Sequence, residues 1–286
     1  MKWLFWRRPV ETFLIWAPGY THRSSGVRAL YRLCHHLNSC GYPSAMIAEG
    51  EANPENWNAP LWSGPVDDSI VVYPEVVTGN PLGARRVVRW VLNDPGLLGG
   101  DKTYADDEMV FVYDPAKLEI ASQAVRAPLD NRRVLWTGLI DPTRIYPDPA
   151  VPRTLDCSFT HKGRKLAERF PLPDGVDAVP LETITPDMAA LGDVLRRTRT
   201  LYSYDHYSNV LREAHISGCD IRVVGPTGDW HDPRQCDCAL NIWWHDDIRE
   251  TYARRFNDRS FVAPFIRELR TRWRVAGPGW RPGLPF

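Results

Sequence analysis

Two acidic residues flank the start of a predicted helix in the second half of the chain. Asp205 follows the apolar segment 201–204, and Glu213 lies in a helix that is predicted to begin at Ser208 and to end at Gly218. The first backbone N–H groups of a helix have no intrahelical partner and can hold an anion. Two carboxylates can bind sugar hydroxyls while the helix end holds a diphosphate. The spacing therefore predicts a nucleotide-sugar site.

A basic turn follows a predicted strand over 155–160 and contains Lys162, Arg164 and Lys165. Transfer of a sugar from a nucleotide requires stabilisation of the charge on the leaving diphosphate, by a metal ion or by fixed cations. No Asp-x-Asp sequence, the usual metal-holding motif of such enzymes, occurs in the chain. We therefore expect a reaction that does not depend on metal. Which of the three cations contacts the diphosphate stays open, and a solvated loop is the other interpretation.

A zinc site is the alternative that the cysteines and histidines raise. His231, Cys236, Cys238 and His245 lie close together in the sequence. Their Cys-x-Cys spacing differs from the usual zinc spacing, so buried thiols near surface histidines are the preferred interpretation. We predict no metal site and no bound cofactor.

Composition limits the class of protein. The 286 residues carry a formal net charge of zero, which provides no overall field for nucleic acid. No apolar run reaches the roughly 20 residues of a membrane span. Six cysteines without a secretory signal are typical of cytosolic thiols. These features predict a cytoplasmic protein, and the segment 1–8 leaves peripheral contact with a membrane open.

Predicted strands and helices alternate along the first half of the chain. Apolar runs that end in turn residues are typical of buried parallel strands. Strands are predicted over 12–17, 44–47, 70–73, 109–113 and 134–136. One helix is predicted over 27–37. A second is expected from Pro81, capped by Asn80, with Val87, Val88, Val91 and Leu92 as its apolar stripe.

The β/α pattern restarts after a stretch with four prolines, 142–152, which is predicted to be an interdomain linker. After the strand over 155–160 come a helix with Met188 and Leu191 on its apolar face, and a strand over 221–224. A last helix is predicted over 259–274. The sequence thus predicts two α/β domains.

The segment from Asp205 to Ala214 resembles the motif Glu-x-Phe-Gly-Leu-x3-Glu-Ala of retaining GT-B glycosyltransferases. Asp205, Tyr207, Ser208 and Asn209 stand at the Glu, Phe, Gly and Leu positions, and Glu213-Ala214 match outright. The block 73–93 is similar to the N-terminal domain of bacterial and phage enzymes of the same group. The resemblance implies a GT-B fold, in which two Rossmann-like domains face a central cleft and a C-terminal helix crosses back to the first domain. The implied parts are an N-terminal acceptor domain over 1–147, a C-terminal nucleotide-sugar domain over 148–258, a crossover helix over 259–275 and a flexible tail over 276–286.

The same resemblance implies roles for individual residues. Glu213 would hold the ribose, Asp205 would contact the transferred sugar, and Lys162 or Lys165 would stabilise the leaving diphosphate. The other expected nucleotide-sugar contacts are Ser25, Gly26, Arg164, Tyr207, Ser208 and Asn209. His22 is a candidate acid or base. On the acceptor side we expect Arg23, Glu75 and Asn80, the last two because they follow a strand at the carboxyl edge of the sheet.

The resulting hypothesis is a retaining glycosyltransferase that uses a nucleotide sugar, most simply a UDP-sugar. Its acceptor is open between a glycan or lipid-linked glycan and a hydroxymethylated base in phage DNA. Arginines that could track a DNA phosphate backbone are Arg85, Arg86, Arg89, Arg132 and Arg133. A sugar-nucleotide epimerase of the same fold and an inactive nucleotide-sugar-binding protein are the alternatives.

Overall fold

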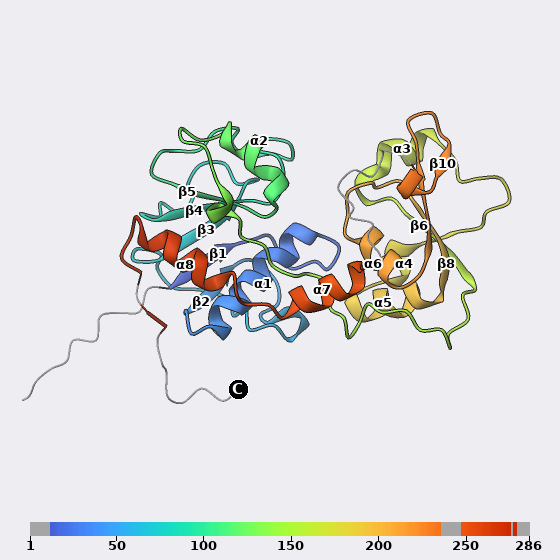
Figure 1. Cartoon of the computed structure of the whole chain (residues 1–286), viewed down its shortest axis with the longest axis horizontal. Helices are drawn as coiled ribbons and strands as arrows, with labels where there is room; N and C mark the ends of the chain where they lie inside the picture. Colours follow the sequence, from blue (N-terminus) through green and yellow to red (C-terminus); the bar gives the residue numbers. More distant parts are fainter. Residues whose placement is uncertain (1–11, 236–246, 276, 279–286) are drawn as a thin grey trace, which may run out of the picture. The chain divides into compact units, whose positions relative to one another are not determined.

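The computed structural model describes residues 12–235, 247–275 and 277–278. The chain folds into two compact α/β units, each built on a five-stranded sheet (Figure 1). Unit 1 contains the described residues of 1–21, 26–137 and 258–286, and unit 2 contains those of 22–25 and 138–257. Two parallel-dominated sheets of this kind are compatible with a pair of Rossmann-like halves.

The sheet of unit 1 is parallel throughout and has the order β2-β1-β3-β4-β5. Its strands are β1 (Phe13–Trp16), β2 (Ser44–Ile47), β3 (Ile70–Pro74), β4 (Val87–Val91) and β5 (Met109–Val112). Valine and isoleucine dominate them because both faces of the sheet are covered. The predicted strands over 12–17, 44–47, 70–73 and 109–113 are confirmed.

The helix predicted from Pro81 to Leu92 is wrong, because Val87–Val91 is strand β4. Asn80 does not cap a helix. Its side-chain oxygen accepts the backbone N–H of Ala84 at 2.9 Å and so closes a turn. β-Branched valines favour the pleated sheet, where neighbours on both sides pack against them. The strand predicted over 134–136 is also wrong, since Val134 makes only an isolated bridge with Val112.

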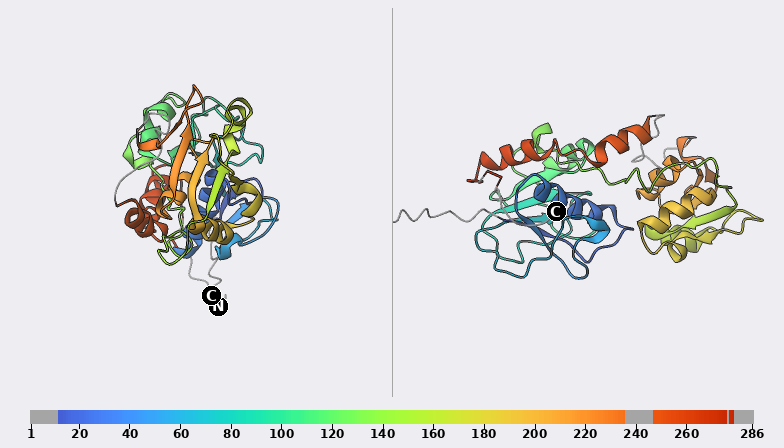
Figure 2. Two further views of the ribbon diagram at one scale, coloured as in Figure 1. Left: turned by 90° about the vertical axis from the view of Figure 1, so that its right-hand side faces the viewer. Right: turned by 90° about the horizontal axis from the view of Figure 1, so that it is seen from below.

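Helix α8 (Val262–Arg270) completes the core of unit 1, together with α1 (Ser25–Ser39) and the short α2 (Leu118–Ser122). Phe265 of α8 packs on Phe13 with ring centroids 6.2 Å apart and on Phe111 at 5.0 Å. Phe261 meets His36 of α1 edge to face at 5.3 Å. The predicted last helix therefore exists, over a shorter range, and packs on the strands from the first half of the chain (Figure 2).

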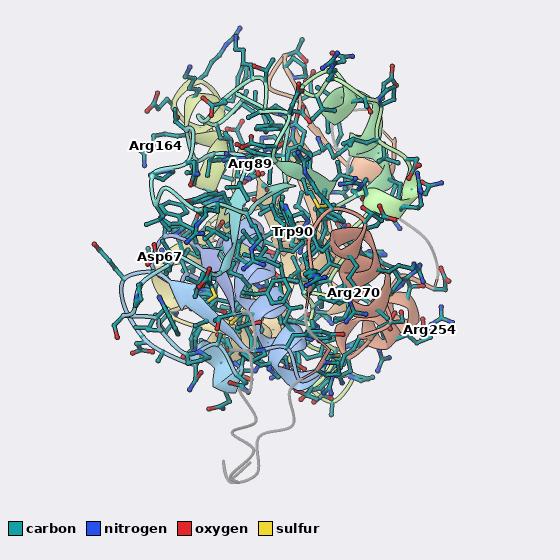
Figure 3. All side chains as sticks on the ribbon, turned by 90° about the vertical axis from the view of Figure 1, so that its left-hand side faces the viewer. Asp67, Arg89, Trp90, Arg164, Arg254 and Arg270 are labelled. Atoms are coloured by element: carbon teal, nitrogen blue, oxygen red, sulfur yellow. The ribbon has the colours of Figure 1, made fainter. Side chains whose placement is uncertain are left out.

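A buried arginine holds the loop that follows β3. Arg89 of β4 is 0% exposed and donates to the carboxylate of Glu108 at 2.9 and 3.0 Å. It also donates to the carbonyl oxygens of Val77 and Gly79 at 2.7 and 2.8 Å. Arg89 is labelled among the side chains of Figure 3. A fully paired buried charge of this kind fixes the backbone around it.

The sheet of unit 2 has the order β10-β9-β8-β6-β7, and only β10 runs antiparallel. Its strands are β6 (Leu155–Phe159), β7 (Val179–Pro180), β8 (Thr198–Ser203), β9 (Asp220–Val224) and β10 (Trp230–His231). Its helices are α3 (Arg164–Arg169), α4 (Leu181–Ile184), α5 (Met188–Arg197), α6 (Val210–Ile216) and α7 (Ile248–Phe256). The strands predicted over 155–160 and 221–224 and the helix around Leu191 are confirmed.

Both sheets share one strand order. In each, the first strand is flanked by the second strand on one side and by the third on the other. The direction of winding therefore reverses between β1 and β3 in unit 1 and between β6 and β8 in unit 2. Open α/β sheets bind ligands at the carboxyl ends of the strands beside such a reversal.

None of the helices in the described ranges has the length and hydropathy that a membrane crossing requires.

Candidate functional site

The turns after β6 and β8 meet at the winding reversal of unit 2. Strands β6 and β8 pair from Leu155–Thr198 to Phe159–Ser203, so both strands end at the same edge of the sheet. A Cβ added at Gly163 would lie 2.0 Å from the carbonyl oxygen of Tyr204, so only glycine allows this approach. The sheet thus brings the predicted basic turn next to the predicted acidic motif.

The carboxylate of Asp205 ties the two turns together. Its Oδ1 accepts the backbone N–H groups of Tyr207 at 2.8 Å and Ser208 at 3.1 Å. Its Oδ2 accepts the Ser208 hydroxyl at 2.6 Å and the backbone N–H of Lys162 at 3.3 Å. The residue is 1% exposed. Four hydrogen-bond donors occupy the carboxylate, so contact with a sugar stays a prediction that requires one of them to be exchanged.

The cations of the basic turn are exposed. The turn is a short 3₁₀ helix, His161–Gly163, and Arg164 begins α3. The side chains of Lys162, Arg164 and Lys165 have no ion-pair partner within the described residues. Three neighbouring cations without an ion-pair partner in the described ranges favour an anionic ligand.

The segment that follows Asp205 has two different environments. Tyr207 is 58% exposed, whereas Ser208 and Asn209 are buried. Helix α6 starts at Val210, and Glu213 on its first turns is 0% exposed. The predicted helix is therefore present, while the ribose contact of Glu213 stays a prediction for a side chain that is buried in this structure.

Glu182 is a residue of this site that sequence reasoning missed. One oxygen of its carboxylate, Oε1, accepts the backbone N–H groups of Thr160 at 2.8 Å and His161 at 2.9 Å. His161 has a φ of 28°, in the left-handed region that residues other than glycine rarely adopt. Its ring stacks on Phe159 with centroids 5.7 Å apart, and burial lowers its pKa.

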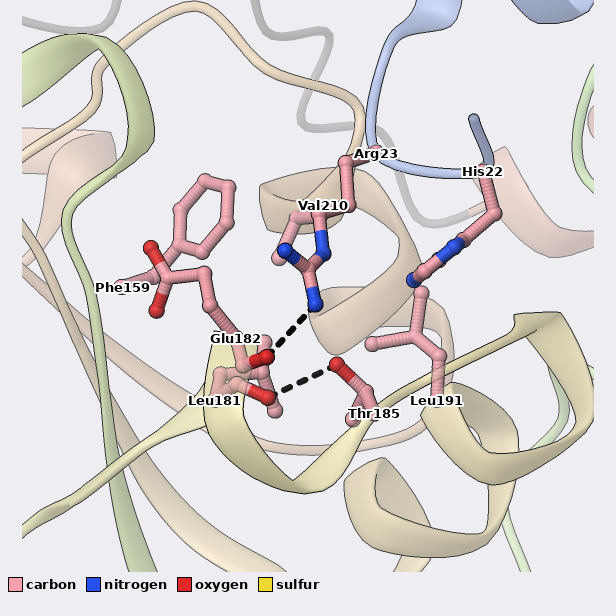
Figure 4. A pocket seen from close by; sticks show the side chains of 8 residues that line it. All are labelled: His22, Arg23, Phe159, Leu181, Glu182, Thr185, Leu191 and Val210. Carbon is pink, nitrogen blue, oxygen red and sulfur yellow. Dashed lines mark hydrogen bonds between the residues drawn. The ribbon is translucent and has the colours of Figure 1, made fainter. Parts of the chain in front are cut away.

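Residues 22–25 of the predicted first-domain loop belong to unit 2. His22 and Arg23 line a pocket together with Phe159, Leu181, Glu182, Thr185, Leu191 and Val210 (Figure 4). The Arg23 guanidinium donates to the carbonyl oxygen of Glu182 at 2.6 Å. The cavity is ≈ 10 Å³, about the space that one water molecule needs, so it does not admit a sugar as it stands. Ser25 and Gly26 open α1 and are half-buried.

The predicted acceptor-side residues of unit 1 have structural partners. Glu75 is 3% exposed, and its Oε2 accepts the backbone N–H of Leu92 at 2.9 Å. Burial raises the pKa of Glu75 to about 7, against opposing hydrogen bonds from the backbone and the charge of Lys117. The Asn80 amide donates to the carbonyl oxygen of Ala84 at 2.8 Å and belongs to a turn.

The arginines that were expected to track a DNA backbone also have partners. Arg89 is buried against Glu108, and Arg133 pairs with Glu268 at 3.4 Å. Arg132 pairs with Asp130 at 2.7 Å. Arg85 lies 3.8 Å from Asp68, and Arg86 donates to the carbonyl oxygen of the same residue. The helix from which Arg85, Arg86 and Arg89 were expected to project does not exist.

Within the ranges that the structure describes, no three His, Cys, Asp or Glu side chains are grouped to hold a metal ion. Of the zinc alternative, His231 lies in β10, and Cys236, Cys238 and His245 lie outside the described residues. The sequence matches no protein-family model, and no curated protein matches it either.

Proposed function

We propose that this chain is a glycosyltransferase that takes its sugar from a nucleotide-sugar donor bound at the edge of the unit 2 sheet. The observation that carries the proposal is the pairing of the Asp205 carboxylate with the backbone of Lys162. This contact holds three exposed cations beside the segment that resembles a nucleotide-sugar motif. The winding reversal between β6 and β8 supports the same edge as the ligand site.

In this proposal the basic turn stabilises the diphosphate as it leaves the sugar. Negative charge on the diphosphate increases as the glycosidic bond breaks, so a nearby cation lowers the barrier more than it strengthens binding. Asp205 keeps the turn in place, and Glu213 binds the ribose. The two Rossmann-like units and the return of α8 to unit 1 are compatible with a GT-B enzyme that retains anomeric configuration.

Binding of a panel of nucleotide sugars, measured by calorimetry, tests the proposal. We expect one of the UDP-, GDP-, TDP- or CMP-sugars to bind, and the triple variant Lys162→Met/Arg164→Met/Lys165→Met to bind it more weakly. The variant Lys102→Met, an exposed lysine of unit 1, is the matched control and should bind normally.

The product distinguishes the alternatives. A glycosyltransferase passes the sugar to an added acceptor, an epimerase releases or rearranges the nucleotide sugar without one, and an inactive binding protein leaves it intact. Binding of no nucleotide sugar at all would contradict the proposal.

A further inference from the structure

The backbone at the end of β6 forms a concave anion site. Thr160 has φ −105° and ψ −50°, in the right-handed helical region, and His161 follows with φ 28°. A right-handed residue followed by a left-handed one turns successive N–H groups toward a common point, where they bind an anion. The N–H groups of Thr160 and His161 converge on one oxygen of Glu182, and the N–H group of Lys162, next in the chain, binds Asp205.

Side-chain carboxylates of the protein fill this site. Glu182 Oε1 lies 2.8 Å from the nitrogen of Thr160 and 2.9 Å from that of His161. Asp205 Oδ2 takes the third N–H, that of Lys162, at the longer distance of 3.3 Å. A single oxygen that accepts two convergent N–H groups is the arrangement in which a phosphate oxygen binds. The Glu182 carboxylate thus stands where an anionic ligand would place an oxygen.

The carboxylates of Asp205 and Glu182 differ in how many hydrogen bonds hold each of them in the site. Asp205 is buried and has three further hydrogen-bond donors. Glu182 lies on the first turn of α4, is half-buried, and among the described residues has these two N–H groups as its side-chain hydrogen-bond partners. Its backbone is held separately, because Arg23 donates to its carbonyl oxygen. The side chain can therefore turn away while α4 stays in place.

We propose that Glu182 is a built-in competitor for the diphosphate of the nucleotide sugar and that a phosphate oxygen displaces its carboxylate on binding. The inference rests on the proposed function for the identity of the ligand. The balance between the two anions depends on charge. A diphosphate carries more negative charge than one carboxylate, and the exposed cations at 162, 164 and 165 lie next to the site, so the diphosphate can displace Glu182. The Glu182 carboxylate then determines how tightly an anion must bind in order to occupy the site.

Calorimetric titration with inorganic pyrophosphate tests this assignment in the full-length chain. The variant Glu182→Gln keeps the shape of the side chain but removes its charge, and neutral acceptors make weaker hydrogen bonds. We expect it to bind pyrophosphate about tenfold more tightly than the wild type. The variant Glu182→Ala, which removes the competitor altogether, should show the same direction, and circular dichroism should show that both variants fold.

The matched control is Glu168→Gln. Glu168 is an exposed residue of α3 near the same cations but bonds none of the three N–H groups, so its loss changes the local charge without vacating the site. Pyrophosphate that binds to Glu182→Gln no more tightly than to Glu168→Gln, or that binds to neither, would overturn the assignment. If pyrophosphate binding gains from Glu182→Gln while no nucleotide sugar binds any form, the competitor role holds and the proposed function fails. If nucleotide sugars bind but Glu182→Gln binds pyrophosphate no more tightly than the wild type, the proposed function holds and the competitor role fails.

Discussion

Glu75 and Leu92 join the carboxyl ends of two neighbouring strands, since the Glu75 carboxylate, just after β3, accepts the Leu92 N–H, just after β4, at 2.9 Å. Burial raises the pKa of Glu75 from 4.5 in a solvated state to about 7. The folded protein therefore binds the proton more tightly than the unfolded chain, and this contribution to stability is lost as the pH rises through 7.

Glu75→Gln mimics the protonated side chain, so its stability relative to the wild type should rise by about 2 kcal/mol between pH 5 and pH 8. Urea unfolding at the two pH values measures the difference. An equal gap between variant and wild type at both values would show that Glu75 is ionised at low pH in the folded state.

A buried histidine predicts the opposite pH dependence. His36 is 1% exposed, and burial followed by the charges of Arg32, His35 and Arg259 lowers its pKa to about 2. Because the unfolded chain takes up the proton first, stability should fall as the pH drops below 6.5. His36→Phe should remove about 2 kcal/mol of the loss that the wild type shows between pH 7 and pH 5. Parallel stability curves for the two proteins over this range would contradict the assignment.

Asp205 should be a strong determinant of stability in unit 2. Replacing its carboxylate with an amide turns an acceptor oxygen into a donor facing N–H and O–H groups. Asp205→Asn should cost about 1–3 kcal/mol of unfolding free energy. Asp174→Asn, at an exposed acidic position of the same unit, is the control and should have little effect. Similar unfolding midpoints for the two variants would mean that the tie between the turns adds no stability.

Gly163 should tolerate no side chain. A Cβ there meets the carbonyl oxygen of Tyr204 at 2.0 Å and its carbon at 2.2 Å, and backbone cannot move aside as a side chain can. Gly163→Ala should therefore destabilise the chain by about 3 kcal/mol or more. Gly277→Ala places its Cβ in open space and serves as the reference. A thermal unfolding midpoint for Gly163→Ala equal to that of the reference would refute this close approach.

The cations of the basic turn should affect turnover more than binding. Lys162→Met, Arg164→Met and Lys165→Met, tested singly with the nucleotide sugar identified by binding, should include at least one variant whose kcat falls by about 10²-fold while its KM changes little. Stability should be unchanged because the side chains are exposed. Near-normal kcat in all three would move the diphosphate site away from this turn.

Short apolar runs were enough to predict most of the strands. The segments around Ile15, Val72 and Val223 are surrounded on both faces, and uninterrupted valine and isoleucine report that burial directly. Val87–Val91 was misread because apolar residues at 87, 88 and 91 also fit the spacing of a helix. The segment is a strand because Val88 pairs with Val72 on one side and with Met109 on the other, and a local sequence pattern does not contain this pairing.

The sequence predicts the site residues that follow a recognisable strand. Lys162 and Asp205 were expected at one site because each follows a predicted strand. Glu182 was missed because the strand before it, Val179–Pro180, is too short to give an apolar run, and the pairing of Ser158 with Pro180 is what brings Glu182 to Thr160 and His161. The rule that singled out Glu75, an acid just after a strand, applies equally to Glu182 after β7. The four hydrogen bonds to Asp205 depend on the turn geometry, which the sequence does not specify by itself.

The return of α8 to unit 1 has a consequence for synthesis on the ribosome. Phe265 fills the space between Phe13 and Phe111, so the unit that is made first lacks part of its core until the last segment emerges. Almost all of unit 2 lies between residues 138 and 257 and is translated before that segment. The later-made unit should therefore acquire its native packing earlier than the first, and nascent chains stopped near residue 257 should hold a protease-resistant unit 2 beside an incompletely packed unit 1.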